Sequence, residues 1–244
     1  MKESDITIGI TSFLRPEALE RLLRSIKATG REYQVLVVDQ SRKPPKVPGN
    51  VQLVQAEFDV GLSRGRNILL ENVTTPYLFI VDDDTMFGEA HESDLCPLTE
   101  YLGRDGCNLT TPSKRNGDPA PGYSIEVKDK HIYINNVEPG KGAWPVDMHP
   151  NYLMLDVAFW KENNIRWDPK LKINEHLAFF YDHLGILNPM IVDGVNILHA
   201  HVMGSPMYRK GRRAHAENHT KFVRDRGILD IHDNSRFRYW PRKT

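Results

Sequence analysis

The stretch YLFIVDDDTMF, residues 77 to 87, decides the fold. Its apolar run, residues 77–81, leads directly into three consecutive aspartates, Asp82, Asp83 and Asp84. An uninterrupted apolar run of this length is typical of a strand that is covered on both faces of a sheet. Three charges at the end of such a strand are costly to desolvate unless they bind something. The stretch therefore predicts a buried strand that ends at a ligand-binding site.

The segments before these aspartates alternate between strand and helix patterns. The apolar runs predict strands at residues 6–11, 33–39, 51–55 and 77–81. A first helix is expected from Pro16 to Gly30, since proline suits the first helical turn and glycine the end of a helix. A second helix is expected after the loop that begins at Gly61. This order indicates a parallel, doubly wound nucleotide-binding unit.

The pattern loosens after Thr85. The sequence predicts a long polar loop at 111–122, a hairpin at 123–135, a strand leading into a short helix at 152–160, a helix at 175–186 and a last core segment at 190–201.

Length and composition fit one α/β domain of ordinary size. The formal net charge is zero, so no overall field indicates a partner. The two cysteines, Cys96 and Cys107, lack metal-site spacing and give no disulfide framework, which suits a reducing compartment. No apolar run reaches membrane-spanning length, and no signal peptide is recognised. We expect a cytoplasmic protein, or one that is peripheral to the cytoplasmic face of a membrane.

Basic charge is concentrated near the C-terminus. From Tyr208 to Thr244 there are eleven lysines and arginines but only four acidic residues. We expect a main domain at 1–207, with a nucleotide-binding half at 1–85 and a second half at 86–207, followed by a basic extension at 208–244. The extension suits contact with nucleic acid or an anionic membrane, and equally suits a helix that packs on the core with a solvated basic face.

Polar side chains cluster where the predicted parallel strands end. Ligands of open α/β sheets bind outside these carboxyl ends. Thr11 ends the first strand and Arg15 follows it, Asp39 ends the second, and the aspartate triplet 82–84 follows the fourth. In extended backbone, Asp82 and Asp84 face one side and Asp83 the other. Two converging carboxylates suit Mg²⁺ or Mn²⁺, although a solvated turn that caps the next helix remains open.

These pieces together resemble the GT-A glycosyltransferases, particularly the family 2-like group. The resemblance covers residues 6–201 and rests on the order and spacing of TSFLRPEALERLLRSI, VVDQS, GLSRGRNILLENVTTPYLFIVDDD and, more weakly, WDPKLKINEHLAFF followed by ILHAH. It implies a Rossmann-like, mostly parallel sheet flanked by helices. It also implies metal-dependent transfer of a sugar from a UDP-sugar to an acceptor hydroxyl, with inversion favoured over retention.

The resemblance assigns roles on the donor side. The residues matched to nucleotide-sugar binding are Thr11, Arg15, Asp39, Gly61, Arg66, Asn67, Asp82 and Asp83. Among them, Thr11 and Asp39 correspond to uracil contacts and Asp82 to the ribose contact. Arg15 either assists them or is a solvated charge at a helix start. Arg66 either reaches the diphosphate or anchors the acidic cluster.

The resemblance also implies a metal site with Mn²⁺ or Mg²⁺. Asp84 corresponds to the metal ligand of the DxD motif, and a histidine after the last core strand completes the site in similar enzymes. Both His199 and His201 occupy such a position. Imidazole is a good ligand for Mn²⁺ and a poorer one for Mg²⁺. The alternative for each histidine is a hydrogen-bonded surface residue.

The catalytic base is expected at Glu175 or His176. Many inverting relatives carry Glu-Asp at this place, whereas this chain has Glu-His. A carboxylate can take the proton of the attacking hydroxyl, and an imidazole can do so near neutral pH. The other possibility is that Glu175 caps the helix while His176 packs outside it.

Three function classes remain open at this point. The first is the glycosyltransferase, acting on a glycan, a lipid-linked glycan or a modified base in nucleic acid. The second is a phosphatase or phosphotransferase of the haloacid dehalogenase kind, which also places DxD after an apolar strand. Its pattern fits poorly, because Met86 stands where that class carries Thr or Val. The third is a non-enzymatic nucleic-acid-binding protein, which leaves the strand-end carboxylates unexplained.

Overall fold

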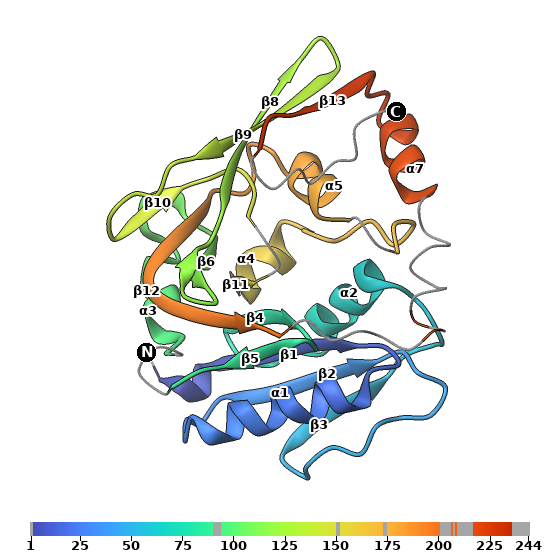
Figure 1. The fold of residues 1–244 in the computed structure, drawn as a ribbon, viewed down its shortest axis with the longest axis vertical. Coiled ribbons are helices and arrows are strands. Elements are labelled where there is room, and N and C mark those ends of the chain that lie inside the picture. Colours follow the sequence, from blue (N-terminus) through green and yellow to red (C-terminus); the bar gives the residue numbers. More distant parts are fainter. Residues whose placement is uncertain are drawn as a thin grey trace.

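The computed structural model describes residues 2–89, 94–149, 152–172, 175–200, 206, 208 and 217–235. Within them, the main sheet has the strand order β10-β12-β6-β11-β4-β1-β2-β3, with β5 paired to β12 and β7 to β6. A smaller sheet has the order β13-β9-β8 and lies over the second half of the chain (Figure 1). No helix of the described segments is long and apolar enough to cross a membrane.

The strands of the main sheet are β1 Ile6–Ser12, β2 Gln34–Asp39, β3 Val51–Gln55, β4 Tyr77–Asp82, β5 Thr85–Phe87, β6 Leu109–Arg115, β7 Asp118–Pro119, β10 Ala143–Pro145, β11 Leu153–Asp156 and β12 Pro189–His199. Those of the smaller sheet are β8 Gly122–Lys128, β9 His131–Val137 and β13 Asp230–Asp233. The helices are α1 Pro16–Ala28, α2 Leu62–Asn72, α3 Cys96–Tyr101, α4 Val157–Glu162, α5 Glu175–Asp182 and α7 Glu217–Asp225, with short 3₁₀ turns at Glu3–Asp5 and Arg104–Gly106.

The first half is the parallel, doubly wound unit that the sequence predicts. Strands β3, β2, β1 and β4 are all parallel. Ser12 is in register with Asp39, and Thr11 with Asp82. Since β1 and β2 end at this level and β4 ends at Asp82, their terminal polar residues come to one edge of the sheet. Backbone pairing alone thus brings these polar residues to one edge, independently of the contacts between their side chains.

Helices cover both faces of this parallel sheet (Figure 1). Leu19, Leu22 and Ile26 of α1 pack with strand residues of one face. Leu69 and Leu70 of α2 pack with strand residues of the other. All of β1 is buried, as expected for a strand that is covered on both sides. The GT-A architecture implied by the resemblance is confirmed for the central sheet and its helices.

The second half adds antiparallel strands beside β4. Strand β11 pairs antiparallel with β4 and β6, and the expected strand followed by a short helix is confirmed as β11 and α4. The predicted polar loop at 111–122 is wrong, because β6 runs to Arg115 and lies within the sheet. Pro112 lies in β6, beyond the two residues that pair with β11. An edge position of this kind tolerates a residue without an N–H.

The predicted hairpin at 123–135 is confirmed as β8 and β9. Its two turn residues, Asp129 and Lys130, both have left-handed φ values, of 51° and 63°. Two such residues form the tight turn that matches the twist of paired strands. Strand β13 pairs in parallel with β9, so residues 217–235 pack onto the second half. The boundary placed between residues 207 and 208 stays a prediction.

We predict that Gly61→Ala lowers the free energy of unfolding by about 2 kcal/mol or more, because Gly61 has a backbone conformation that is accessible essentially only to glycine. Its φ is 88° and its ψ 168°. An added Cβ would also lie 2.6 Å from the Cα of Lys172. Chemical denaturation measures the loss. Gly49→Ala is the control, since nothing lies within 4 Å of its added Cβ. Equal effects of the two substitutions would contradict this reading of Gly61.

Candidate functional site

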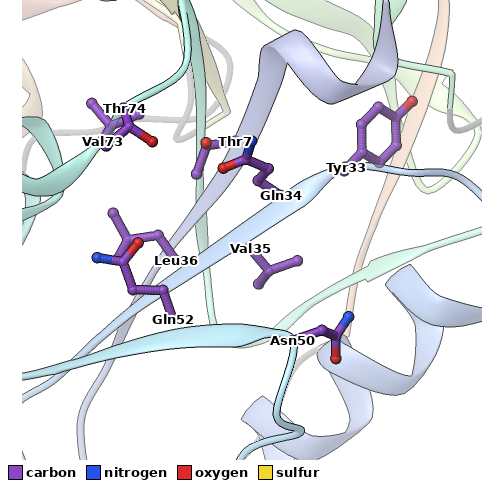
Figure 2. Close-up of a pocket in the computed structure, with 9 residues that line it drawn as sticks. All are labelled: Thr7, Tyr33, Gln34, Val35, Leu36, Asn50, Gln52, Val73 and Thr74. Carbon is purple, nitrogen blue, oxygen red and sulfur yellow. The ribbon is translucent and has the colours of Figure 1, made fainter.

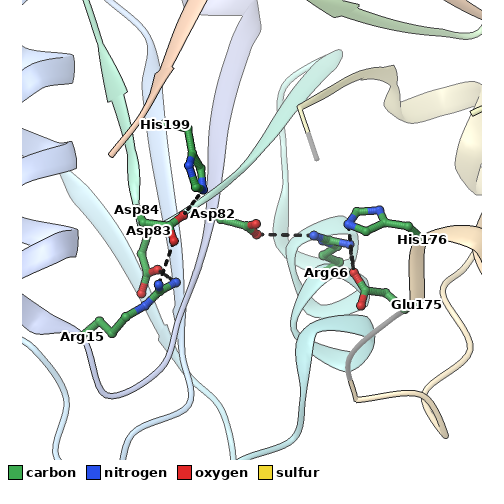
Figure 3. Close-up of polar contacts among 8 residues, drawn as sticks. All are labelled: Arg15, Arg66, Asp82, Asp83, Asp84, Glu175, His176 and His199. Atoms are coloured by element: carbon green, nitrogen blue, oxygen red, sulfur yellow. Dashed lines mark hydrogen bonds and ion pairs between the residues drawn. The ribbon is translucent and has the colours of Figure 1, made fainter. Parts of the chain in front are cut away.

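Two groups of charged side chains lie at the carboxyl edge of the parallel strands (Figure 3). In one group, Arg15 contacts Asp83 and Asp84, and His199 lies beside Asp84. In the other, Arg66 contacts Asp82 and Glu175, and His176 lies beside Glu175. The aspartate triplet at the end of β4 is divided between the two groups.

Arg15 is buried against the aspartates. Its Nη1 donates to Asp84 Oδ2 at 2.8 Å, and its Nη2 contacts Asp83 Oδ1. The prediction of a solvated charge at the helix start is therefore wrong for Arg15. Burial raises the pKa of Asp83 to about 7, against the opposing charge of Arg15. The ring of Tyr208 lies 4.6 Å from the guanidinium of Arg15 and covers it as a cation–π partner.

Asp84 and His199 form the part of the site that best suits a metal. Asp84 Oδ1 accepts no hydrogen bond from any residue that the structure describes, and it lies 3.6 Å from His199 Nε2. A carboxylate oxygen that faces an imidazole nitrogen is a donor set that Mn²⁺ accepts. Within the described segments, no three His, Cys, Asp or Glu side chains form a metal-binding group. His201 lies outside the described residues.

The backbone near His199 is held by a residue that sequence reasoning missed. Asn116 Oδ1 accepts a hydrogen bond from the His199 N–H at 2.6 Å. The Asn116-Gly117 dipeptide indicates a turn. Only the pairing of β12 with β6 brings that turn to the end of β12. Asn116 thus fixes the position of the candidate ligand His199 without facing the charged groups itself.

Arg66 joins three elements that are distant in the sequence. It is 0% exposed on α2, and its Nη2 donates to Asp82 Oδ1 at 3.4 Å while its Nη1 donates to Glu175 Oε1. The guanidinium fork suits two carboxylates at once. Of the two roles foreseen for Arg66, the anchoring of the acidic cluster is the one that the structure displays.

Glu175 and His176 are neighbours with different exposure. Glu175 is 2% exposed and His176 is 16% exposed, and His176 Nε2 lies 3.5 Å from Glu175 Oε1. Burial lowers the pKa of His176 below its usual range, so the imidazole is neutral at pH 7. Glu175 therefore faces Arg66 inside the site, and a neutral, more accessible imidazole lies next to it.

Thr11 and Asp39 lie buried at neighbouring strand ends. Both carboxylate oxygens of Asp39 accept hydrogen bonds from Ser41, at 3.0 Å from its N–H and 3.1 Å from its hydroxyl. Burial raises the pKa of Asp39. The Thr11 hydroxyl has no hydrogen-bond partner among the described residues. A buried hydroxyl of this kind is available to a ligand.

Asn67 and Gly61 hold a loop rather than face the charged groups. The Asn67 amide donates to the Trp167 carbonyl at 2.9 Å and accepts from the Trp167 N–H at 3.0 Å. The N–H of Leu62, next to Gly61, donates to the Lys172 carbonyl at 2.8 Å. These contacts fasten residues 167–172 against the start of α2. Asn67 and Gly61 thus have a scaffold role here, and their expected role as donor contacts stays a prediction.

A separate hollow of about 310 Å³ opens at the other end of the parallel strands (Figure 2). Its lining includes Thr7, Gln34 and Gln52, from the amino-terminal parts of β1, β2 and β3, and contains no charged side chain. It is therefore distinct from the charged site.

Comparisons with known proteins agree with this architecture. The family model described as Glycosyl transferase family 2 matches residues 7–161. Human beta-1,4 N-acetylgalactosaminyltransferase 1 is 28% identical over 240 residues, which cover 92% of this chain and 44% of that protein. Mouse beta-1,4 N-acetylgalactosaminyltransferase 2 is 36% identical over 206 residues, which cover 80% of this chain and 39% of that protein. The chain thus spans less than half the length of these relatives.

Among solved structures, Staphylococcus aureus TarS is similar with a TM-score of 0.61 and 14% sequence identity. The match covers 93% of this chain and 39% of that chain. At this identity the likeness supports the fold alone.

We predict that Arg66→Met destabilises the protein by about 3–5 kcal/mol, because it leaves the Glu175 carboxylate buried without a counter-charge. The double variant Arg66→Met with Glu175→Leu should lose less, since the buried charge of Glu175 is removed together with its counter-charge. Chemical denaturation of the two variants tests this order. Arg64→Met is the control, because Arg64 forms an exposed pair with Glu71 whose loss costs up to about 1 kcal/mol. A double variant less stable than Arg66→Met would contradict the explanation.

Proposed function

This chain belongs to glycosyl transferase family 2 and is a glycosyltransferase, and we propose that it transfers a sugar from a UDP-sugar to an acceptor hydroxyl with a divalent metal ion, Mn²⁺ or Mg²⁺. The observation that carries the proposal is the pair formed by Asp84 Oδ1 and His199 Nε2, 3.6 Å apart at the carboxyl end of β4. The family membership sets aside the phosphatase and the non-enzymatic nucleic-acid-binding protein.

The donor we propose is UDP-N-acetylgalactosamine. Two relatives are named as beta-1,4 N-acetylgalactosaminyltransferases, and each alignment covers at least four-fifths of this chain. Their names specify a β linkage. Since the sugar of such a nucleotide donor is α-linked, a β product implies inversion. The acceptor we propose is a glycan. Contact of the basic extension with nucleic acid or an anionic membrane stays a prediction, because eight of the eleven lysines and arginines of 208–244 lie outside the described residues.

On the donor side, the uracil would lie against Thr11 and Asp39. Asp39 would accept the ring N–H, and the buried hydroxyl of Thr11 would gain its missing partner. Asp82, held by Arg66, would receive the ribose. Asp83 pairs with Arg15 and would hold Arg15 in place near the diphosphate.

Asp84 with His199 would hold the metal ion, which would offset the charge of the leaving diphosphate. Their separation of 3.6 Å leaves the two donor atoms facing each other without a direct hydrogen bond.

On the acceptor side, the proton of the attacking hydroxyl would pass to Glu175. Its carboxylate is held in place by the hydrogen bond from Arg66. The neutral His176 next to it would orient the acceptor hydroxyl, or would take the proton in its place. The two residues act at the chemical step, so neither is required to bind the nucleotide.

We predict that Asp84→Asn abolishes the Mn²⁺-dependent part of UDP binding and the slow hydrolysis of UDP-N-acetylgalactosamine. The substitution keeps the side chain's volume and removes one charge from a divalent site. Calorimetric titration of UDP with and without Mn²⁺ measures the first effect. Asp118→Asn, at an exposed position on β7, is the matched control. Binding of UDP that does not depend on Mn²⁺ in the unmodified chain would refute the metal-dependent mechanism.

We also predict that Glu175→Gln lowers kcat for hydrolysis by about 100-fold or more, as expected for loss of a general base, while UDP still binds. His176→Ala is measured in parallel. If His176→Ala were the more damaging substitution and Glu175→Gln mild, the base would be His176.

A further inference from the structure

Arg226 makes an ion-pair arrangement that the proposed function does not use. It follows α7, and its Nε donates to Asp182 Oδ1 at 2.6 Å. Its Nη2 contacts Asp182 Oδ2 and also donates to Asp168 Oδ2 at 3.2 Å. One guanidinium therefore binds both oxygens of one carboxylate and reaches a second carboxylate.

The two aspartates lie at the two ends of the segment that carries the candidate base. Asp168 comes directly after Trp167, whose main chain is held by Asn67. Asp182 is the last residue of α5, and Glu175 is its first. Arg226 thus joins the beginning and the end of residues 168–182. The start of α5 is also held by α2, through Arg66.

The surroundings of Arg226 distinguish it from an ordinary surface charge. Its side chain is 13% exposed, and its guanidinium lies over the ring of Phe222 at 5.0 Å. Phe222 is buried and meets Tyr181 of α5 edge-on, with ring centroids 5.9 Å apart. The nearby Arg224 is 69% exposed and pairs only with its neighbour Asp225 among the contacts described. Arg226 is the one of the two that is built into the contact between α7 and α5.

We propose that Arg226 is a positioning residue for the transfer reaction, holding both ends of segment 168–182 so that α5 presents Glu175 and His176 to the acceptor. This inference rests on the proposed function, since it assigns the catalytic step to that helix. Arg226 acts through Asp168 and Asp182 and contacts no reacting group. The C-terminal residues 217–235 are then part of the catalytic scaffold.

The guanidinium fork is the feature that this role requires. A guanidinium presents donors in a fixed plane that matches both oxygens of a carboxylate, whereas an ammonium is a point charge on a flexible stem. Arg226→Lys therefore keeps the charge and loses the geometry. A misplacement of a catalytic group by about 1 Å can lower the rate about 100-fold. The lysine variant separates positioning from simple charge neutralisation.

The test compares Arg226→Lys and Arg226→Gln with the control Arg224→Gln. Hydrolysis of UDP-N-acetylgalactosamine gives kcat and KM. In the proposed mechanism, attacking water passes its proton to the same base that serves an acceptor hydroxyl. Hydrogen exchange of the backbone amides of residues 175–182 reports on α5 without requiring activity. We expect both Arg226 variants to lower kcat about 10-fold or more with KM changed less than about 2-fold, because the proposed donor contacts lie on other elements. We also expect faster exchange in α5, with Arg224→Gln unchanged in both.

The outcomes separate the two proposals. Unchanged exchange in α5, or unchanged kcat in an active enzyme, would overturn the role of Arg226. An equal fall in kcat for Arg224→Gln would overturn it as well. Absence of hydrolysis in the unmodified chain would overturn the proposed function, and the exchange comparison would still decide whether Arg226 holds α5. The Arg226→Lys variant keeps the test valid if Arg226→Gln fails to fold.

Discussion

The buried guanidinium of Arg66 is the constraint on which the site depends. Glu175 and Asp82 come from opposite halves of the chain, and both are bound by this one side chain. Moving a carboxylate out of water costs several kcal/mol unless a counter-charge and hydrogen bonds compensate for it. Glu175 is 2% exposed, and Arg66 supplies this counter-charge and hydrogen bond. The same contact fixes the distance between the end of β4 and the start of α5.

Two arginines also determine how the carboxylates of the aspartate triplet, residues 82–84, are arranged. Three neighbouring carboxylates repel one another, and the structure relieves this by directing them to different arginines. Asp83 and Asp84 face Arg15, whereas Asp82 faces Arg66. This division leaves one oxygen of Asp84 facing His199 without a hydrogen bond. The arginines thus do more than neutralise charge, since they select which carboxylate oxygen remains available to a ligand.

Sequence reasoning succeeded where regular backbone pairing controls position. The apolar runs that precede Thr11, Asp39 and Asp82 are enough to bring these residues to one edge, because parallel strands fix their own register. It failed where the outcome depends on tertiary neighbours. The polar run 111–122 predicts a loop, yet β6 continues to Arg115 because it pairs with β12 from a distant part of the chain. Nothing local distinguishes Arg226 from Arg224, and only the packing of α7 on α5 does so.

The two halves of the site are consequently held by different kinds of contact. On the proposed donor side, register between strands changes only in whole-residue steps, and buried apolar layers on both faces oppose any such step. On the proposed acceptor side, residues 167–172 and 175–182 lie outside the sheet, and side-chain contacts hold them. Asn67 holds its beginning and Arg66 holds the start of α5. Substitutions that alter these contacts would move the proposed acceptor groups while the strand ends stay in place, because no strand pairing of the described residues links the two. A fold arranged in this way can keep one donor chemistry and change its acceptor through side chains that touch neither substrate.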